Sequence, residues 1–128
     1  MAIASVREVA PTIAGAVKAT KAHNKGIVVD LIGVADKVTR AKEARALGAK
    51  FIEFHAGLDE QAKPGYNLKV LLSAGEEARV PFSVAGGVNL STIEAVRRAG
   101  VDVAVVGGSI YGADDPALAA KQLRAAII

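Results

Sequence analysis

Short apolar runs typical of β-strands alternate along this chain with longer segments of helical periodicity. The strand-like runs are residues 26–32, 51–56, 81–85 and 103–106. The helical segments are residues 36–47, 67–79, 91–99 and 118–127, with one more, residues 12–23, ahead of the first run. A helix between successive strands returns the chain to the same end of a sheet, so the strands must run parallel. We therefore predict an α/β fold with a four-stranded parallel sheet and a leading helix.

The opening segment has two interpretations. Residues 2–6 form either a strand stub or an extension of the helix at residues 12–23. We favour the stub, because Pro11 inside a continuous helix would remove a backbone hydrogen bond. No linker or low-complexity tract divides the rest of the chain. We expect one domain over residues 1–128, in which residues 1–11 are a leader from outside the family or the strand stub.

Local signals mark where several helices begin and end. Asn24, followed by Lys-Gly, is typical of a left-handed helix end. Ser91 with Glu94 three residues later predicts a capping box at a helix start. Asp115 followed by Pro116 predicts an N-cap with proline in the first turn of the last helix.

Composition excludes several classes of function. The 16 Lys and Arg residues are scattered among 13 Asp and Glu, and aromatic residues make up only 4%, so we expect no nucleic-acid partner. No apolar run reaches the length of a membrane span, and we expect no membrane partner. The chain has no cysteine, which excludes disulfides and thiol chemistry and fits the cytoplasm.

Two strand-like runs end in paired glycines. Gly86-Gly87 follows residues 81–85, and Gly107-Gly108 follows residues 103–106. Ligands of parallel α/β proteins bind at the carboxyl ends of the strands, where glycine lets backbone amides approach an anion. We predict that the two pairs bind one phosphate group together. The plainer alternative is that these glycines only allow tight turns.

Polar side chains gather on one face of the expected sheet. Side chains alternate between faces along a strand, which places Asp30, Glu53, His55 and Ser83 on the face opposite the large apolar residues. Ionisable groups that share an otherwise apolar face indicate a functional site. The alternative is a structural ion-pair or hydrogen-bond set.

Four stretches resemble a known enzyme family: TIAGAVKATKAHNKGIVVDLIG, ALGAKFIEFHAGLDEQAKPGYNL, ARVPFSVAGGV and VAVVGGSIYGADDPA. They are similar to the C-terminal half of bacterial 3-hexulose-6-phosphate synthases, which belong to the orotidine-5′-monophosphate decarboxylase superfamily of ribulose-phosphate-binding βα barrels. The similarity runs from residue 12 to residue 128. The resemblance implies a (β/α)8 TIM barrel, usually dimeric, that adds formaldehyde to D-ribulose 5-phosphate with the help of Mg²⁺.

The resemblance also assigns expected roles to residues of this chain. It implies that Gly86 and Gly87 grip phosphate after the seventh barrel strand, and that Gly107 and Gly108 do so after the eighth. It places His55 near the substrate. The family's Asp-x-Lys-x-x-Asp motif, which supplies acid-base and metal-binding groups, does not occur in this sequence.

We therefore expect a truncated or engineered half-barrel that keeps the phosphate-binding turns, contains no catalytic residue or metal site of its own, and is inactive alone. With 128 residues it has about half the ~250 of a closed eight-stranded barrel. One alternative is an aldolase that becomes active on dimerisation or on joining a complementary N-terminal half. Another is a purely structural unit.

A half-barrel would have open strand edges and an open inner face. Two copies can pair into a pseudo-barrel with two-fold symmetry, and we expect such a homodimer or other self-association. The alternative is a flavodoxin-like three-layer sandwich, in which the helix at residues 12–23 covers the inner face. In either case phosphate or a sugar phosphate is the expected ligand.

Overall fold

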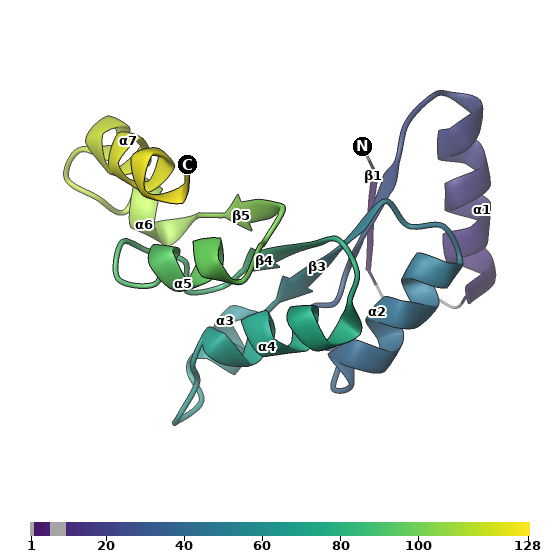
Figure 1. Ribbon diagram of the computed structural model, residues 1–128, viewed down its shortest axis with the longest axis horizontal. Coiled ribbons are helices and arrows are strands. Elements are labelled where there is room, and N and C mark those ends of the chain that lie inside the picture. The colour runs from purple at the N-terminus through teal and green to yellow at the C-terminus, as the bar shows by residue number, and fades with distance from the viewer. Residues whose placement is uncertain (1, 6–9) are drawn as a thin grey trace.

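Five parallel strands form one curved sheet in the sequential order β1-β2-β3-β4-β5 (Figure 1). The computed structural model describes residues 2–5 and 10–128. The strands are β1 (Ala2–Ser5), β2 (Ile27–Asp30), β3 (Phe51–His55), β4 (Phe82–Ala85) and β5 (Val103–Val105). Because every strand pairs in parallel with the next one along the chain, the carboxyl ends of all five meet at the same edge.

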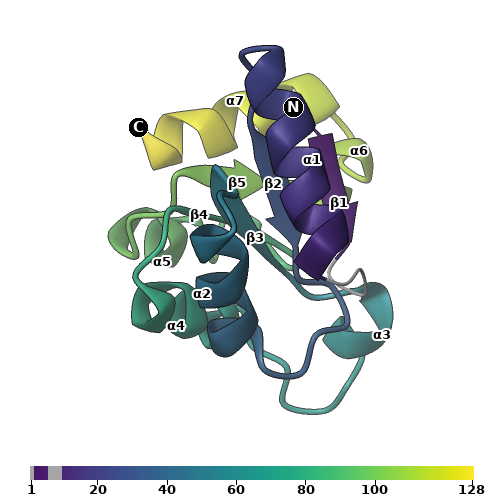
Figure 2. The same cartoon turned by 90° about the vertical axis from the view of Figure 1, so that its right-hand side faces the viewer.

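The main helices lie along the convex side of the sheet, and within the described residues no helix covers the concave side (Figure 1). They are α1 (Ala10–Ala22), α2 (Lys37–Ala46), α3 (Leu58–Gln61), α4 (Lys69–Ala78), α5 (Ile93–Arg98), α6 (Gly108–Tyr111) and α7 (Pro116–Ile127). Figure 2 shows α1 running alongside β1 and β2. The half-barrel form of the α/β fold is therefore the one observed. The sandwich alternative is not adopted, because α1 packs on the same side as α2.

The core lies between the convex face of the sheet and these helices. Outward-facing strand residues such as Val29, Ile52 and Val84 are fully buried there, as are Ile13 of α1 and Leu71 of α4. Burying apolar side chains of this size contributes about 1.5–3 kcal/mol each. This apolar contact holds the helices against the convex face and leaves the polar residues on the concave one.

The opening segment adds a fifth strand to the four that we expected. Ala2–Ser5 pairs in parallel with Ile27–Asp30, so the strand stub is part of the sheet. The helix after it begins at Ala10, two residues earlier than expected, with Pro11 in its first turn. Proline is tolerated there because a first-turn amide has no intrahelical acceptor. Residues 1 and 6–9 lie outside the described part of the chain.

Two helix-end predictions are confirmed. Asn24 has φ of 55°, the left-handed conformation expected after α1. Asp115 accepts a hydrogen bond at 2.9 Å from the amide of Leu118, and Pro116 opens α7. No helix in the described ranges is both long enough and apolar enough to cross a membrane.

The predicted capping box of α5 is wrong. The Oδ1 atom of Asn89 accepts hydrogen bonds from the amides of Ser91 at 2.9 Å and Thr92 at 3.2 Å, and α5 begins only at Ile93. Asn89 takes the position because its short side chain folds back onto the backbone two and three residues later. Ser91 is thereby left exposed, outside the helix.

Candidate functional site

Asp30, Glu53 and His55 converge on the concave face at the carboxyl ends of β2 and β3. Asp30 and Glu53 are register partners on neighbouring strands, so their side chains point to the same face. The Nδ1 atom of His55 lies 3.0 Å and 3.2 Å from the two carboxylate oxygens of Asp30, and 3.8 Å from a carboxylate oxygen of Glu53. Ser83 donates a hydrogen bond at 3.4 Å to Glu53 from β4. The structure thus brings together the side chains that strand alternation placed on one face.

Burial governs the electrostatics of this cluster. Only 12% of the Glu53 side chain is exposed. Its burial raises the pKa of the Glu53 carboxyl, the negative charge of Asp30 raises it further, and the nearby His55 opposes this shift. Asp30 also accepts a hydrogen bond at 2.9 Å from the amide of Ile32, which fixes its orientation. An imidazole oriented by a fixed carboxylate can hold or transfer a proton at its ring nitrogens.

The same three residues form a group of side chains of the types that can hold a metal ion, and it is the one such group found in the described part of the chain. One ligand atom from each of Asp30, Glu53 and His55 lies within 4.8 Å of the others. The set does not fit Mg²⁺, which prefers oxygen ligands, because one donor is an imidazole nitrogen and the Asp30 oxygens already bind His55 and the amide of Ile32.

The glycine turn after β4 has a backbone that few other residues adopt. Gly86 and Gly87 have φ of +106° and +94°. A Cβ atom on Gly86 would lie 2.6 Å from the carbonyl oxygen of Ala56. Gly86 is half-buried and Gly87 is exposed, so the turn presents its backbone to solvent at the carboxyl edge of the sheet.

The glycine turn after β5 differs from the first. Gly107 has φ of −110°, so no left-handed backbone requires glycine there. Gly107 and Gly108 are both exposed, and α6 begins at Gly108. Since α6 has only four residues, its dipole is small, and an anion here would depend mainly on individual backbone amides.

The two glycine turns and the polar cluster lie at the same edge of the sheet. Ala85, just before the first turn, is the register partner of both His55 on β3 and Val105 on β5. Ser109 of α6 donates a hydrogen bond at 2.9 Å to the carbonyl of Val88, which joins the second turn directly to the first. The two turns and the polar cluster are therefore neighbours at this edge.

Sequence reasoning missed two side chains that contact the first turn. The hydroxyl of Tyr66 donates a hydrogen bond at 2.6 Å to the carbonyl of Gly86. The side-chain amide of Gln61 donates one at 2.8 Å to the carbonyl of Ala56, against which Gly86 packs. Both lie in the segment between β3 and α4. The Tyr66 hydrogen bond spans 20 residues, and no local pattern in the sequence indicates such a contact.

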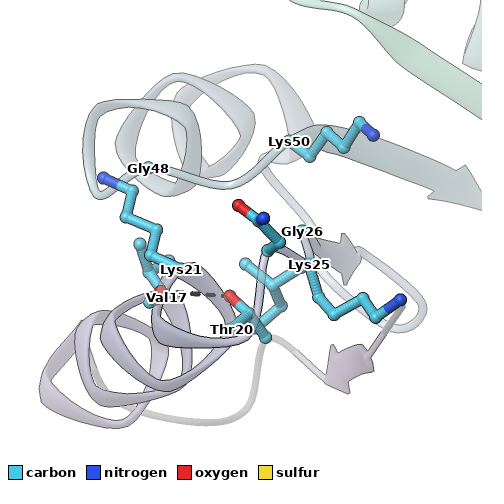
Figure 3. Close-up of a pocket in the computed structure, with 9 residues that line it drawn as sticks. Val17, Thr20, Lys21, Lys25, Gly26, Gly48 and Lys50 are labelled. Carbon is cyan, nitrogen blue, oxygen red and sulfur yellow. Dashed lines mark hydrogen bonds between the residues drawn. The ribbon is translucent and has the colours of Figure 1, made fainter.

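A hollow at the opposite end of the sheet does not form a comparable site. It has a volume of about 540 Å³ and is lined by Lys21, Lys25 and Lys50 around Gly26 and Gly48. Figure 3 shows the ammonium group of Lys21 on the other side of the hollow from those of Lys25 and Lys50. Because these charges point apart, they do not surround a common anion position.

Comparisons with known proteins fit this geometry. A 3-hexulose-6-phosphate synthase of Mycobacterium gastri is 75% identical over 116 residues, 91% of this chain and 56% of the relative. The enzyme of the same name from Methylomonas aminofaciens is 42% identical over 113 residues, 88% of this chain and 54% of the relative. This chain thus spans about half the length of the curated relatives it matches.

Solved structures show the same relationship. A crystal structure of 3-hexulose-6-phosphate synthase superposes with a TM-score of 0.95 at 69% identity, over 98% of this chain and 61% of that chain. A structure of KGPDC from Streptococcus mutans in complex with a sugar phosphate has a TM-score of 0.84 at 22% identity, over 98% of this chain and 60% of that one, which shows likeness of fold alone. The sequence pattern of one family matches residues 2–123. The chain belongs to that family, the orotidine 5′-phosphate decarboxylase / HUMPS family.

Proposed function

We propose that this chain binds the phosphate group of a sugar phosphate between Gly86-Gly87 and Gly107-Gly108, as one sector of a 3-hexulose-6-phosphate synthase barrel. The observation that carries the proposal is the direct link between the two turns, the 2.9 Å hydrogen bond from Ser109 to Val88. Backbone amides from both turns then face one ligand position, an arrangement that suits a phosphate with several oxygens to satisfy.

The sugar-phosphate class is supported by the relatives that match at 75% and 42% identity, both of which carry the name 3-hexulose-6-phosphate synthase. In line with the family resemblance, D-ribulose 5-phosphate is the proposed ligand. With its phosphate at the glycine turns, Asp30, Glu53 and His55 lie next to the sugar. His55 would exchange a proton with a sugar oxygen while Asp30 holds the imidazole in place.

We further propose that the chain by itself does not catalyse aldol addition. An enediolate formed from ribulose phosphate needs a base at carbon and a cation or acid at oxygen. The Asp-x-Lys-x-x-Asp motif that supplies these groups in the resembled family does not occur in this sequence. The Mg²⁺ of that family would then be held by other residues of a complete barrel.

A phosphate titration followed by amide NMR tests the binding proposal. We expect the amide signals of Gly86, Gly87, Gly107 and Gly108 to shift at millimolar phosphate, and the amide of Gly48, at the opposite end of the sheet, to stay in place. An assay with ribulose 5-phosphate, formaldehyde and Mg²⁺ should give no product. Glycine signals that stay unchanged at high millimolar phosphate would remove the binding proposal, and product formation would remove the claim of inactivity.

A second proposal is self-association into a homodimer through the open edges of the sheet. The edge strand β5 carries Val103 and Val105 on the concave face, and they are 42% and 41% exposed. Apolar side chains on an unpaired strand edge favour pairing with another chain. Light scattering at micromolar concentration should give twice the monomer mass, and turnover that appears only in the dimer would favour an active, complemented enzyme.

A purely structural unit is the remaining alternative, and it predicts neither phosphate shifts nor turnover. For the compartment we propose the cytoplasm, because a chain without cysteine has no disulfide bond that requires an oxidising environment. Cell fractionation with an antibody against the chain tests this placement.

A further inference from the structure

Three consecutive carbonyl groups, those of Gly86, Gly87 and Val88, each accept a hydrogen bond from a side-chain hydroxyl. The hydrogen bonds are those of Tyr66 with Gly86 at 2.6 Å, Thr92 with Gly87 at 3.0 Å, and Ser109 with Val88 at 2.9 Å. Tyr66, in the loop before α4, and Ser109, in α6, lie 20 and 21 residues from their acceptors, whereas Thr92, just before α5, is five residues from Gly87 in the same loop. The turn is therefore fixed by contacts that its own glycines cannot provide.

These hydrogen bonds determine where the amides of the turn point. In a planar trans peptide, the carbonyl of one residue and the N–H of the next point in opposite directions. Holding the carbonyl of Gly86 sets the direction of the Gly87 amide, and holding that of Gly87 sets the Val88 amide. The donors also keep partly negative carbonyl oxygens turned toward themselves, away from the side on which the amides can meet an anion.

Glycine makes such contacts more important. Gly86 and Gly87 populate many backbone conformations in the absence of restraint, and ordering each residue costs about 1–2 kcal/mol of conformational entropy. A turn that is already ordered before the ligand arrives loses less conformational entropy when the ligand binds. The half-buried Tyr66 suits this role at neutral pH, because burial raises the pKa of its phenol and the charge of Glu60 raises it further, so the hydroxyl keeps its proton.

We propose that Tyr66, Thr92 and Ser109 are positioning residues that orient the Gly86–Val88 backbone for a phosphate-bearing ligand. This inference rests on the proposed function, in which that turn binds phosphate. By this inference, the segment between β3 and α4 contributes to ligand affinity through Tyr66. Tyr66 acts through Gly86 and does not have to contact the ligand itself. Ser109 adds a hydrogen bond between the two glycine turns to the pairing of β4 with β5 that already holds them side by side.

The test removes one hydroxyl at a time and measures the Kd of inorganic phosphate by amide NMR. Tyr66→Phe and Ser109→Ala each delete one donor with little change of volume, and each should weaken phosphate binding about three- to tenfold. Ser109→Thr keeps a hydroxyl and should restore most of the affinity. Thr20→Val is the matched control: it deletes a 3.0 Å hydroxyl-to-carbonyl hydrogen bond to Val17 at the opposite end of the sheet, and should leave the Kd unchanged.

The ligand-free spectra separate this inference from the proposed function. If the positioning role is right, Tyr66→Phe shifts the amide signal of Gly87 even without phosphate, whereas Thr20→Val does not. If the unmodified chain binds no phosphate, the proposed function fails, and these amide signals alone decide whether the hydroxyls orient the turn. Variants whose amide signals and phosphate Kd both match the unmodified chain would overturn the inference.

Discussion

Replacing Gly86 with alanine tests the backbone on which the phosphate turn depends. A Cβ at this position would lie 2.6 Å from the carbonyl oxygen of Ala56, and φ is +106°. The left-handed backbone costs a non-glycine residue about 1–2 kcal/mol, and forcing a methyl group into a packed place costs about 1–3 kcal/mol. Ala56 is fully buried and its amide donates to Ala85 at 3.1 Å, so it cannot move aside freely. We expect Gly86→Ala to lower the free energy of unfolding by about 2–5 kcal/mol.

Gly65 provides the matched control. Its φ is +80°, but nothing lies within 4 Å of the place that a Cβ would occupy. Gly65→Ala should therefore cost only the backbone part, about 1–2 kcal/mol. Urea unfolding followed by circular dichroism measures both variants, and a phosphate titration of each shows whether binding is lost with the turn. If Gly86→Ala were no less stable than Gly65→Ala, the close approach of the turn to Ala56 would be refuted.

Two further predictions concern charge and packing. Burial and the charge of Asp30 raise the pKa of Glu53 in the folded chain, so the folded state binds a proton more tightly than the unfolded one and stability falls as pH rises from the unfolded pKa through the raised one. Glu53→Gln removes that pH dependence. The free energy of unfolding of the variant, measured with urea from pH 4 to pH 7, should therefore rise relative to that of the unmodified chain as the pH rises. A relative fall would contradict the direction of the Glu53 pKa shift. Gly75→Ala would place a Cβ against the buried ring of Phe82 and should destabilise by up to about 2 kcal/mol net of helix propensity, whereas Gly15→Ala, in open space on α1, should stabilise by about 0.5–1 kcal/mol. Thermal unfolding that ranked the two glycine variants in the opposite order would show that the packing around α4 is looser than described.

The parts of this fold that could be predicted from sequence are those set by local pattern. The strands at residues 27–30, 51–55, 82–85 and 103–105 fall within the runs expected, because short apolar segments between helical ones have few other ways to be buried. Alternation along a strand also placed Glu53 and His55 together, because a strand has only two faces.

Features that depend on contacts distant in sequence could not be predicted in this way. The bond from Tyr66 to Gly86 spans 20 residues, and that from Ser109 to Val88 spans 21. One local rule also failed: Ser91 and Glu94 matched a capping pattern, but the Ser91 amide, which Glu94 would have accepted from, donates to Asn89 instead. Such competition between neighbouring polar side chains depends on a backbone path that the pattern does not specify.

The sequential strand order has a consequence for how the chain acquires its structure. Each strand begins roughly 20–30 residues after the one it pairs with, so every pairing closes a short loop and none waits for a distant part of the chain. A ribosome delivers these units in the same order in which they pair. Each βα unit can therefore dock onto the preceding one as soon as it emerges, and the sheet can grow during translation from its first strand toward its last.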